Sequence, residues 1–193
     1  GTNYAEGISD VGVIKTKQLT NNAINTDSIE SFFDKATCDK RKMTYLENGD
    51  VVFASMGVGS LGKTSLFYYE GSKRFVTDST LRIYRKKASA RVSPEALSIF
   101  LQSKVGQELI YRHVVGSTGI INIYDDDITN LPIPILDDAT QKKIAYNVQN
   151  SFALNRKSKK LLKCVKKAIE IAIERDEEVA VEWLKERTEE LGV

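Results

Sequence analysis

The segment 57–64, Gly-Val-Gly-Ser-Leu-Gly-Lys-Thr, has the residue types and spacing that point most directly to chemistry. It matches the pattern G-x-x-x-x-G-K-[ST], in which loop amides, a lysine and a helix N-terminus hold phosphates. A strand-like run at 50–55 precedes it, but aromatic and hydroxyl side chains follow Thr64, and that composition favours a second strand. We therefore predict a hairpin loop between two antiparallel strands. A P-loop nucleotide hydrolase remains the alternative function.

The sequence predicts neither a catalytic group nor a metal site. His113 is the only histidine, and Cys38 and Cys164 lie far apart with no further ligand near either. The acidic triplet 125–127 lacks the glycine turn and distal glutamate of a calcium loop, so we expect it to begin a helical turn. Unpaired thiols, the absence of an apolar run of about 18 residues and the absence of a visible signal peptide predict a cytoplasmic protein.

Basic and amide side chains gather in several polar segments. Lysine and arginine suit phosphates, and the amides of glutamine and asparagine match the donor and acceptor edge of adenine. We interpret these segments as DNA contacts, with solvated loops as the plain alternative. The candidate DNA-binding residues are Lys15, Lys17, Gln18, Asn21, Asn22, Lys40, Arg41, Lys42, Ser60, Lys63, Arg112, His113, Ser117 and Thr118.

The sequence pattern around these residues predicts short strands and helices, and therefore an α+β fold. Short β-like runs alternate with polar loops in the first half, and 11–14 is one such strand. Ser93 followed by Pro94 is typical of a helix start, a second helix is expected near 105–113, and a strand near 120–123. We predict a β-rich globular domain with short helices over 1–136.

The remainder, 137–193, predicts a long helical region for spacing and dimerisation. Asp138 is expected to cap the helix, neither glycine nor proline follows until Gly192, and Asp176 is expected to cap a short terminal helix. Apolar residues recur at heptad spacing, as in a coiled coil, with a polar middle. The predicted dimer interface consists of Ile144, Val148, Asn155, Leu162, Val165 and Ile169.

The net charge of +2 conceals a division along this helical region. Between 141 and 168 all charged residues are basic, whereas acidic residues dominate from Glu170 onward. Two antiparallel chains would place the basic segment of one beside the acidic segment of the other. We therefore predict an antiparallel homodimer through the long helix.

Four motifs together carry a family resemblance. They are L-x-x-G-D within 45–52, G-S-x-G-K within 57–63, Gly-Ser-Thr-Gly-Ile at 116–120, and Leu-Pro-Ile-Pro-Ile at 131–135, which is followed by Gln-Lys-Lys-Ile at 141–144. In this order the chain resembles the specificity subunit of type I DNA restriction-modification systems. Full-length members carry two recognition domains and two helices. This chain holds one of each, so it is either a half-size subunit that dimerises or a piece of a longer polypeptide.

The resemblance implies a DNA target-recognition domain that reads one half of a bipartite site. It implies that the long helix is a spacer that docks a methyltransferase subunit, and that a restriction subunit joins the complex. The chain itself would be non-catalytic and hold no cofactor, because S-adenosylmethionine belongs to the methyltransferase. A protein-binding adaptor that does not touch DNA is the other alternative.

Overall fold

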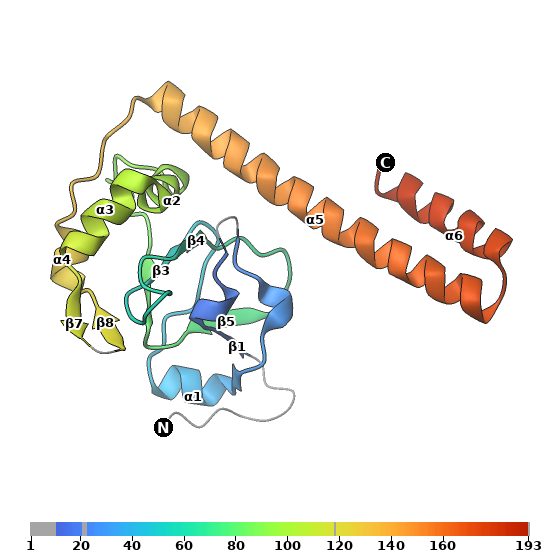
Figure 1. The fold of residues 1–193 in the computed structure, drawn as a ribbon, viewed down its shortest axis with the longest axis horizontal. Helices are drawn as coiled ribbons and strands as arrows, with labels where there is room; N and C mark the ends of the chain where they lie inside the picture. Colours follow the sequence, from blue (N-terminus) through green and yellow to red (C-terminus); the bar gives the residue numbers. More distant parts are fainter. Residues whose placement is uncertain (1–10, 21–22, 118, 193) are drawn as a thin grey trace. The chain divides into compact units, whose positions relative to one another are not determined.

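The chain is α+β and divides into two compact units, Gly1–Ala145 and Tyr146–Val193 (Figure 1). The computed structural model describes residues 11–20, 23–117 and 119–192. The division falls within the long helix, whereas the predicted domain boundary was at its start, after residue 136. The predicted fold class, with a β-rich part followed by a long helix, is confirmed.

Two three-stranded sheets form the centre of the first unit. One has the order β2-β1-β5, with β1 antiparallel to β2 and parallel to β5. The other has the order β4-β3-β6, and all of its pairs are antiparallel. The strands are β1 (Val11–Ile14), β2 (Phe32–Phe33), β3 (Val51–Ala54), β4 (Thr64–Leu66), β5 (Arg74–Thr77) and β6 (Leu81–Tyr84).

Alternation along the strands divides the core. Val11 and Val13 pack with Cys38 of helix α1 (Lys35–Lys40) in one apolar cluster. Ile14, on the other face of the strand, belongs to a second cluster together with Phe75. Gly12 lies opposite Phe75 in the parallel ladder, and a Cβ there would come within 2.8 Å of the Phe75 ring. Glycine at this position therefore lets the aromatic ring fill the core.

Two helices follow in succession, α2 (Pro94–Gln102) and α3 (Lys104–Arg112). Helix α2 packs against β3 and β4, and α3 packs on α2. Ser93 caps α2, as predicted, because its hydroxyl accepts the Ala96 N–H at 3.1 Å. Ser103 ends α2 and caps α3 by accepting the Gly106 N–H. A Cβ on Gly106 would lie 2.1 Å from the Phe100 carbonyl oxygen, so this sharp junction requires glycine.

The rest of the first unit leads into the long helix. The hairpin of β7 (Val115–Ser117) and β8 (Ile120–Asn122) precedes α4 (Asp125–Thr129), which is the short turn predicted for the acidic triplet. Helix α5 spans Asp138–Glu174. Asp137, rather than the predicted Asp138, caps it, because the Asp137 carboxylate accepts the Thr140 N–H at 2.9 Å. That hydrogen bond lowers the pKa of Asp137.

In the second unit, α6 (Glu177–Glu190) folds back along the C-terminal part of α5 (Figure 1). Asp176 caps α6 as predicted, since its carboxylate accepts the Glu178 N–H at 2.6 Å. Ala168 and Ala180 are buried, and Lys157 donates to the Gly192 carbonyl oxygen at 2.7 Å. Among the described residues, no helix is long and apolar enough to cross a membrane.

Candidate nucleic-acid interface

The glycine-rich segment is a hairpin loop between β3 and β4, as predicted. Phe53 pairs with Thr64, and the Gly62 N–H donates to the Ala54 carbonyl oxygen at 2.9 Å. A strand, not a helix, follows the loop, and the buried Thr64 hydroxyl donates to the Gly62 carbonyl oxygen. A phosphate-binding loop depends on a helix N-terminus at this point. The motif letters are therefore present here without the geometry that gives them their usual chemistry.

Helix α3 fixes the shape of this loop. The Gln107 amide donates to the Gly62 carbonyl oxygen at 3.0 Å and to the Leu101 carbonyl oxygen at 2.6 Å. Gly62 has a positive φ of 85°, and a Cβ on it would lie 2.8 Å from the Gln107 amide oxygen. Side-chain hydrogen bonds thus hold the loop, which is not a free hairpin tip.

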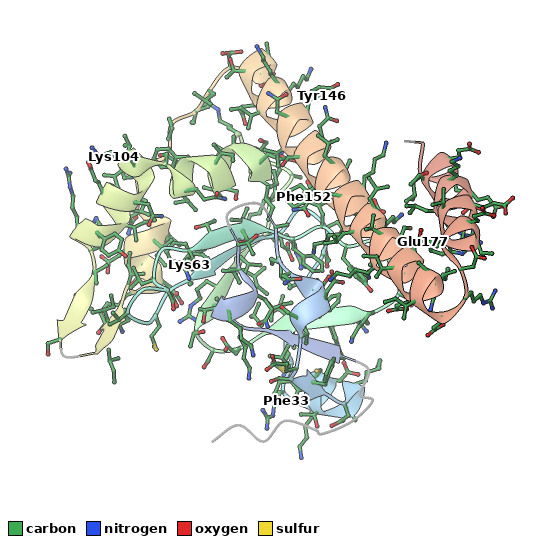
Figure 2. All side chains as sticks on the ribbon, turned by 45° about the vertical axis from the view of Figure 1, so that its right-hand side comes forward. Phe33, Lys63, Lys104, Tyr146, Phe152 and Glu177 are labelled. Carbon is green, nitrogen blue, oxygen red and sulfur yellow. The ribbon has the colours of Figure 1, made fainter. Side chains whose placement is uncertain are left out.

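A polar hollow of about 310 Å³ lies between the loop and α3. Its walls carry one amine, two side-chain amides and two hydroxyls. The Gln107 amide and the Thr64 hydroxyl already hold backbone carbonyls, whereas the Lys63 amine can bind a phosphate oxygen. Lys63 is exposed at this hollow, and Figure 2 shows its position on the unit. The lining residues are Gly59, Leu61, Gly62, Lys63, Thr64, Gln102, Gln107 and Tyr111.

The β7–β8 hairpin is joined to the same loop. The Gly57 N–H donates to the Ile121 carbonyl oxygen at 2.9 Å, and Met56 and Asn122 form an antiparallel bridge. Two motifs that lie far apart in the sequence, 57–63 and 116–120, are therefore neighbours. We call the surface formed by the loop 57–63, the β7–β8 hairpin and the C-terminal end of α3 the glycine-loop face.

The glycine-loop face carries exposed cations and a histidine that lies beside a carboxylate. Arg112 is exposed at the end of α3, and neither Arg112 nor Lys63 forms an ion pair with any described residue. His113, by contrast, places its Nδ1 atom 3.3 Å from an Asp127 carboxylate oxygen. Of the predicted DNA contacts, Ser60, Lys63, Arg112, His113 and Ser117 lie on this face. Thr118 falls outside the described residues.

The prediction for Gln18 needs correction. Gln18 is only 1% exposed. Its amide oxygen accepts the Lys15 N–H at 3.0 Å, and its amide nitrogen donates to the Ser28 carbonyl oxygen at 2.8 Å. Both ends of the amide thus hold the loop after β1, and burial keeps the side chain from reaching a base. Lys15 is half-buried, and the amine of Lys17 pairs with the Glu30 carboxylate. Asn21 and Asn22 lie outside the described residues.

The basic cluster Lys40–Lys42 lies at the end of α1, away from the glycine-loop face (Figures 1 and 2). Here three cations cover aromatic rings. Arg41 lies 5.2 Å from the centre of the Phe33 ring, and Lys73 and Arg74 lie over Phe32 and Tyr45 at 4.3 and 3.4 Å. The sequence reasoning missed Lys73 and Arg74, although an adjacent Lys-Arg pair before a strand was the available signal. We call Lys40–Lys42 with Lys73 and Arg74 the α1 patch.

The aspartate of the L-x-x-G-D motif has a structural role. Asp50 is 1% exposed, and its carboxylate accepts the Glu47 N–H at 2.8 Å. Arg85, just after β6, donates from Nε and Nη2 to the two carboxylate oxygens at 2.8 and 2.7 Å. The hydrogen bond to Asp50 raises the pKa of Arg85. This bidentate pair ties the start of β3 to the end of β6.

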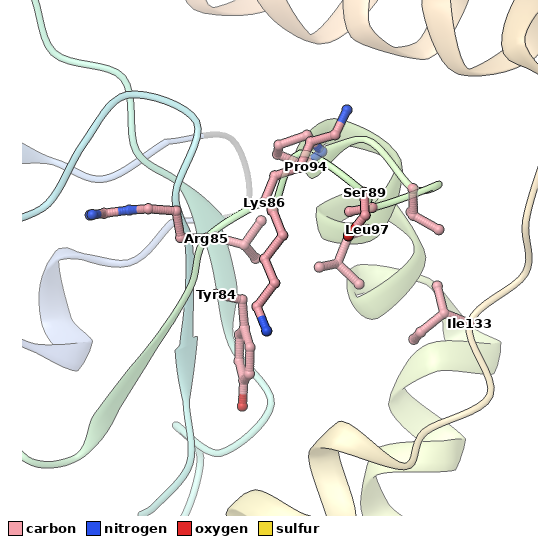
Figure 3. Close-up of a pocket in the computed structure, with 11 residues that line it drawn as sticks. Tyr84, Arg85, Lys86, Ser89, Pro94, Leu97 and Ile133 are labelled. Atoms are coloured by element: carbon pink, nitrogen blue, oxygen red, sulfur yellow. The ribbon is translucent and has the colours of Figure 1, made fainter.

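A second hollow, of about 380 Å³, lies beside the basic segment 85–91. Figure 3 shows the Lys86 side chain directed toward the ring of Tyr84, with Leu97 and Ile133 on the opposite side. Burial raises the pKa of Tyr84. Sequence reasoning missed this segment, although its four basic residues within Arg-Lys-Lys-Ala-Ser-Ala-Arg were visible.

The predicted dimer seam is partly exposed in the second unit. Leu162, Val165 and Ile169 are exposed, and Ile173 continues their row at 81% exposure. Ile144, Val148 and Asn155 are half-buried. Helix α6 lies beside the C-terminal part of α5 in the same chain, where Lys157 donates to the Gly192 carbonyl oxygen.

Among the described residues, no group of three or more histidine, cysteine, aspartate or glutamate side chains could hold a metal ion. In comparisons with known proteins, no family model matches the chain. No curated protein sequence matches it either.

Proposed function

We propose that this chain is the DNA sequence-specificity component of a restriction-modification methyltransferase complex, recognising one half of a bipartite site. The observation that carries the proposal is the glycine-loop face. It joins two motifs of the resemblance into one surface of fixed shape, on which Lys63 and Arg112 are exposed and form no ion pair with any residue that the structure describes. A rigid loop beside a hairpin holds the groups that contact DNA in a defined geometry, which a mobile loop would not do.

The residues of this face divide by role. Lys63 and Arg112 supply phosphate contacts, which position a protein on the duplex without reading sequence. Ser60, Ser117 and the amide of Gln102 at the hollow are the proposed contacts to base edges. The α1 patch offers a second contact with the DNA backbone, through charge alone. Aromatic rings hold its arginines and Lys73 in place.

Catalysis belongs to the partners in this proposal. A methyltransferase subunit binds S-adenosylmethionine and modifies the DNA, and a restriction subunit joins the same complex. The chain then works in the cytoplasm, where its DNA and its partners are, and it has no membrane role. Helix α5 serves as the spacer to which the methyltransferase docks.

The exposed row Leu162, Val165, Ile169 and Ile173, which we call the stripe, supports a homodimer. Apolar side chains at heptad spacing on an uncovered helix face pair readily with a second copy. Because α6 already accompanies the basic part of α5, the affinity rests on the stripe rather than on charge. A two-fold dimer would read two inverted half-sites with a fixed gap, since site symmetry mirrors protein symmetry.

The test is a titration of labelled duplex DNA with the chain, measured by fluorescence anisotropy. It is carried out over a salt series, with and without the methyltransferase subunit. We expect weak binding by the chain alone and tighter binding with the partner. Affinity should fall steeply with salt, because binding releases counterions from the DNA and this release is less favourable at higher salt. Lys63→Ala and Arg112→Ala should each weaken binding to all sequences and reduce the salt slope by about 1. Lys104→Ala, at the other end of α3, is the matched control.

Absence of duplex binding at low salt with the methyltransferase present would refute the proposal. If the chain then still captured the methyltransferase, the protein-binding adaptor would replace it. Equal losses for the Lys104 control and the Lys63 variant would remove the glycine-loop face as the contact surface.

A further inference from the structure

Two exposed aliphatic side chains stand at the edge of the glycine-loop face. Val58, in the loop, is 65% exposed, and Ile120, at the start of β8, is 70% exposed. Single exposed apolar residues are ordinary on protein surfaces. These two differ because separate loops bring them to one place.

The backbone register makes them neighbours. The Gly57 N–H donates to the Ile121 carbonyl oxygen, and the segments run antiparallel, as the Met56–Asn122 bridge shows. Val58 follows that hydrogen bond in the loop, and Ile120 precedes it in the hairpin. The two residues are thus brought near each other at the outer end of the paired segments.

Glycines isolate this pair from the rest of the surface. Gly57 and Gly59 flank Val58, and Gly119 precedes Ile120, all with positive φ. A Cβ on Gly59 or Gly119 would meet no atom within 4 Å, so the space beside these two glycines is open. Backbone without side chains also lets a polyanion approach closely.

We propose that Val58 and Ile120 form an apolar wedge that enters between stacked base pairs of the bound DNA and bends the duplex. The inference rests on the proposed function. DNA-bending proteins insert aliphatic or aromatic side chains into a base step and hold the flanking phosphates with cations. Lys63 and Arg112 supply those cations on the same face. The chain would then read the deformability of a base step in addition to hydrogen bonds.

The test compares duplexes that differ in the cost of unstacking. The full chain is titrated with a short intact duplex and with the same duplex carrying one central mismatch, where stacking is already weakened. We expect the wild type to bind the mismatched duplex about tenfold more tightly, since unstacking a step costs a few kcal/mol that the mismatch partly removes. A 2-aminopurine beside the mismatch should brighten on binding.

The Val58→Ser, Ile120→Ser double variant should lose both the preference and the brightening. The control Ile99→Ser, Val105→Ser removes two exposed aliphatic side chains from α2 and α3 of the same unit and should keep both. Circular dichroism should show the same melting for all three proteins, because no altered side chain is buried.

The outcomes separate the two proposals. If the wild type binds DNA without preferring the mismatch, or if the double variant keeps the preference, the wedge is refuted and the DNA-binding proposal stands. If the double variant loses only its affinity for the methyltransferase subunit, the pair is a protein contact and the wedge is again refuted. If no duplex binds at low salt with the partner present, the proposed function fails, and the wedge fails with it.

Discussion

Removing Arg85 should destabilise the first unit far more than removing Arg82, although both arginines belong to the same stretch of chain. Arg85 pairs with Asp50, whose side chain is 1% exposed, whereas Arg82 pairs with Asp125, whose side chain is 62% exposed. Breaking a buried pair leaves an uncompensated charge, at a cost of about 3–5 kcal/mol. Because the Arg85 side chain is itself 39% exposed, water relieves part of that cost. We therefore expect Arg85→Ala to cost about 2–4 kcal/mol and Arg82→Ala about 0–1 kcal/mol.

The assay is thermal and urea unfolding followed by far-UV circular dichroism. The sole tryptophan, Trp183, lies in α6, so its fluorescence would report on the second unit instead. A loss of 3 kcal/mol should lower Tm by roughly 6–12 °C in a chain of this size. Adding Asp50→Asn to Arg85→Ala should recover part of the loss, because the buried carboxylate is then neutral. Equal losses for Arg85→Ala and Arg82→Ala would refute the reasoning from burial.

Two further outcomes follow from the exposed and buried apolar residues. The double variant Val165→Asp, Ile169→Asp should be monomeric in sedimentation, since each fully buried apolar side chain contributes roughly 1.5–3 kcal/mol to the dimer. The control Leu154→Asp, outside the heptad register, should leave the dimer intact. A wild type that stays monomeric at high concentration would contradict dimerisation through the stripe. Burial raises the pKa of Cys38, so the stability contributed by its neutral thiol is present below the ordinary thiol pKa of about 8.5 and is lost as pH rises through the higher folded value. Iodoacetamide at pH 8 should therefore label half-buried Cys164 in the native chain and Cys38 only in denaturant.

Local signals in the sequence were sufficient for most elements. The serine–proline start of α2, the cap at Asp176 and the strand after Thr64 depend on residues adjacent in the chain, and each lies where it was predicted. The cap of α5 was misplaced by one residue because two aspartates stand side by side, and either carboxylate suits an N-cap.

Burial of polar residues was not predictable in the same way. Gln18 was chosen for DNA because its amide matches a base edge, but the same amide satisfies two backbone groups in a tight turn. Asp50 and Arg85 are 35 residues apart, and only the pairing of β3 with β6 brings them together. The α1 patch likewise needs β5 next to β1 before Arg74 can reach Tyr45.

The charge division is compatible with more than one pairing. Basic residues in 141–168 and acidic residues from Glu170 onward are complementary whether the acidic segment comes from a second chain or folds back from the same one. The break at Arg175–Asp176 decides between them locally, because a cap at Asp176 starts a new helix that returns along α5. Once α6 occupies one side of α5, a second copy has the stripe left to bind. The stripe then supplies the affinity of the proposed dimer. Its predicted antiparallel orientation also depends on how the polar middle of the seam, around Asn155, is matched.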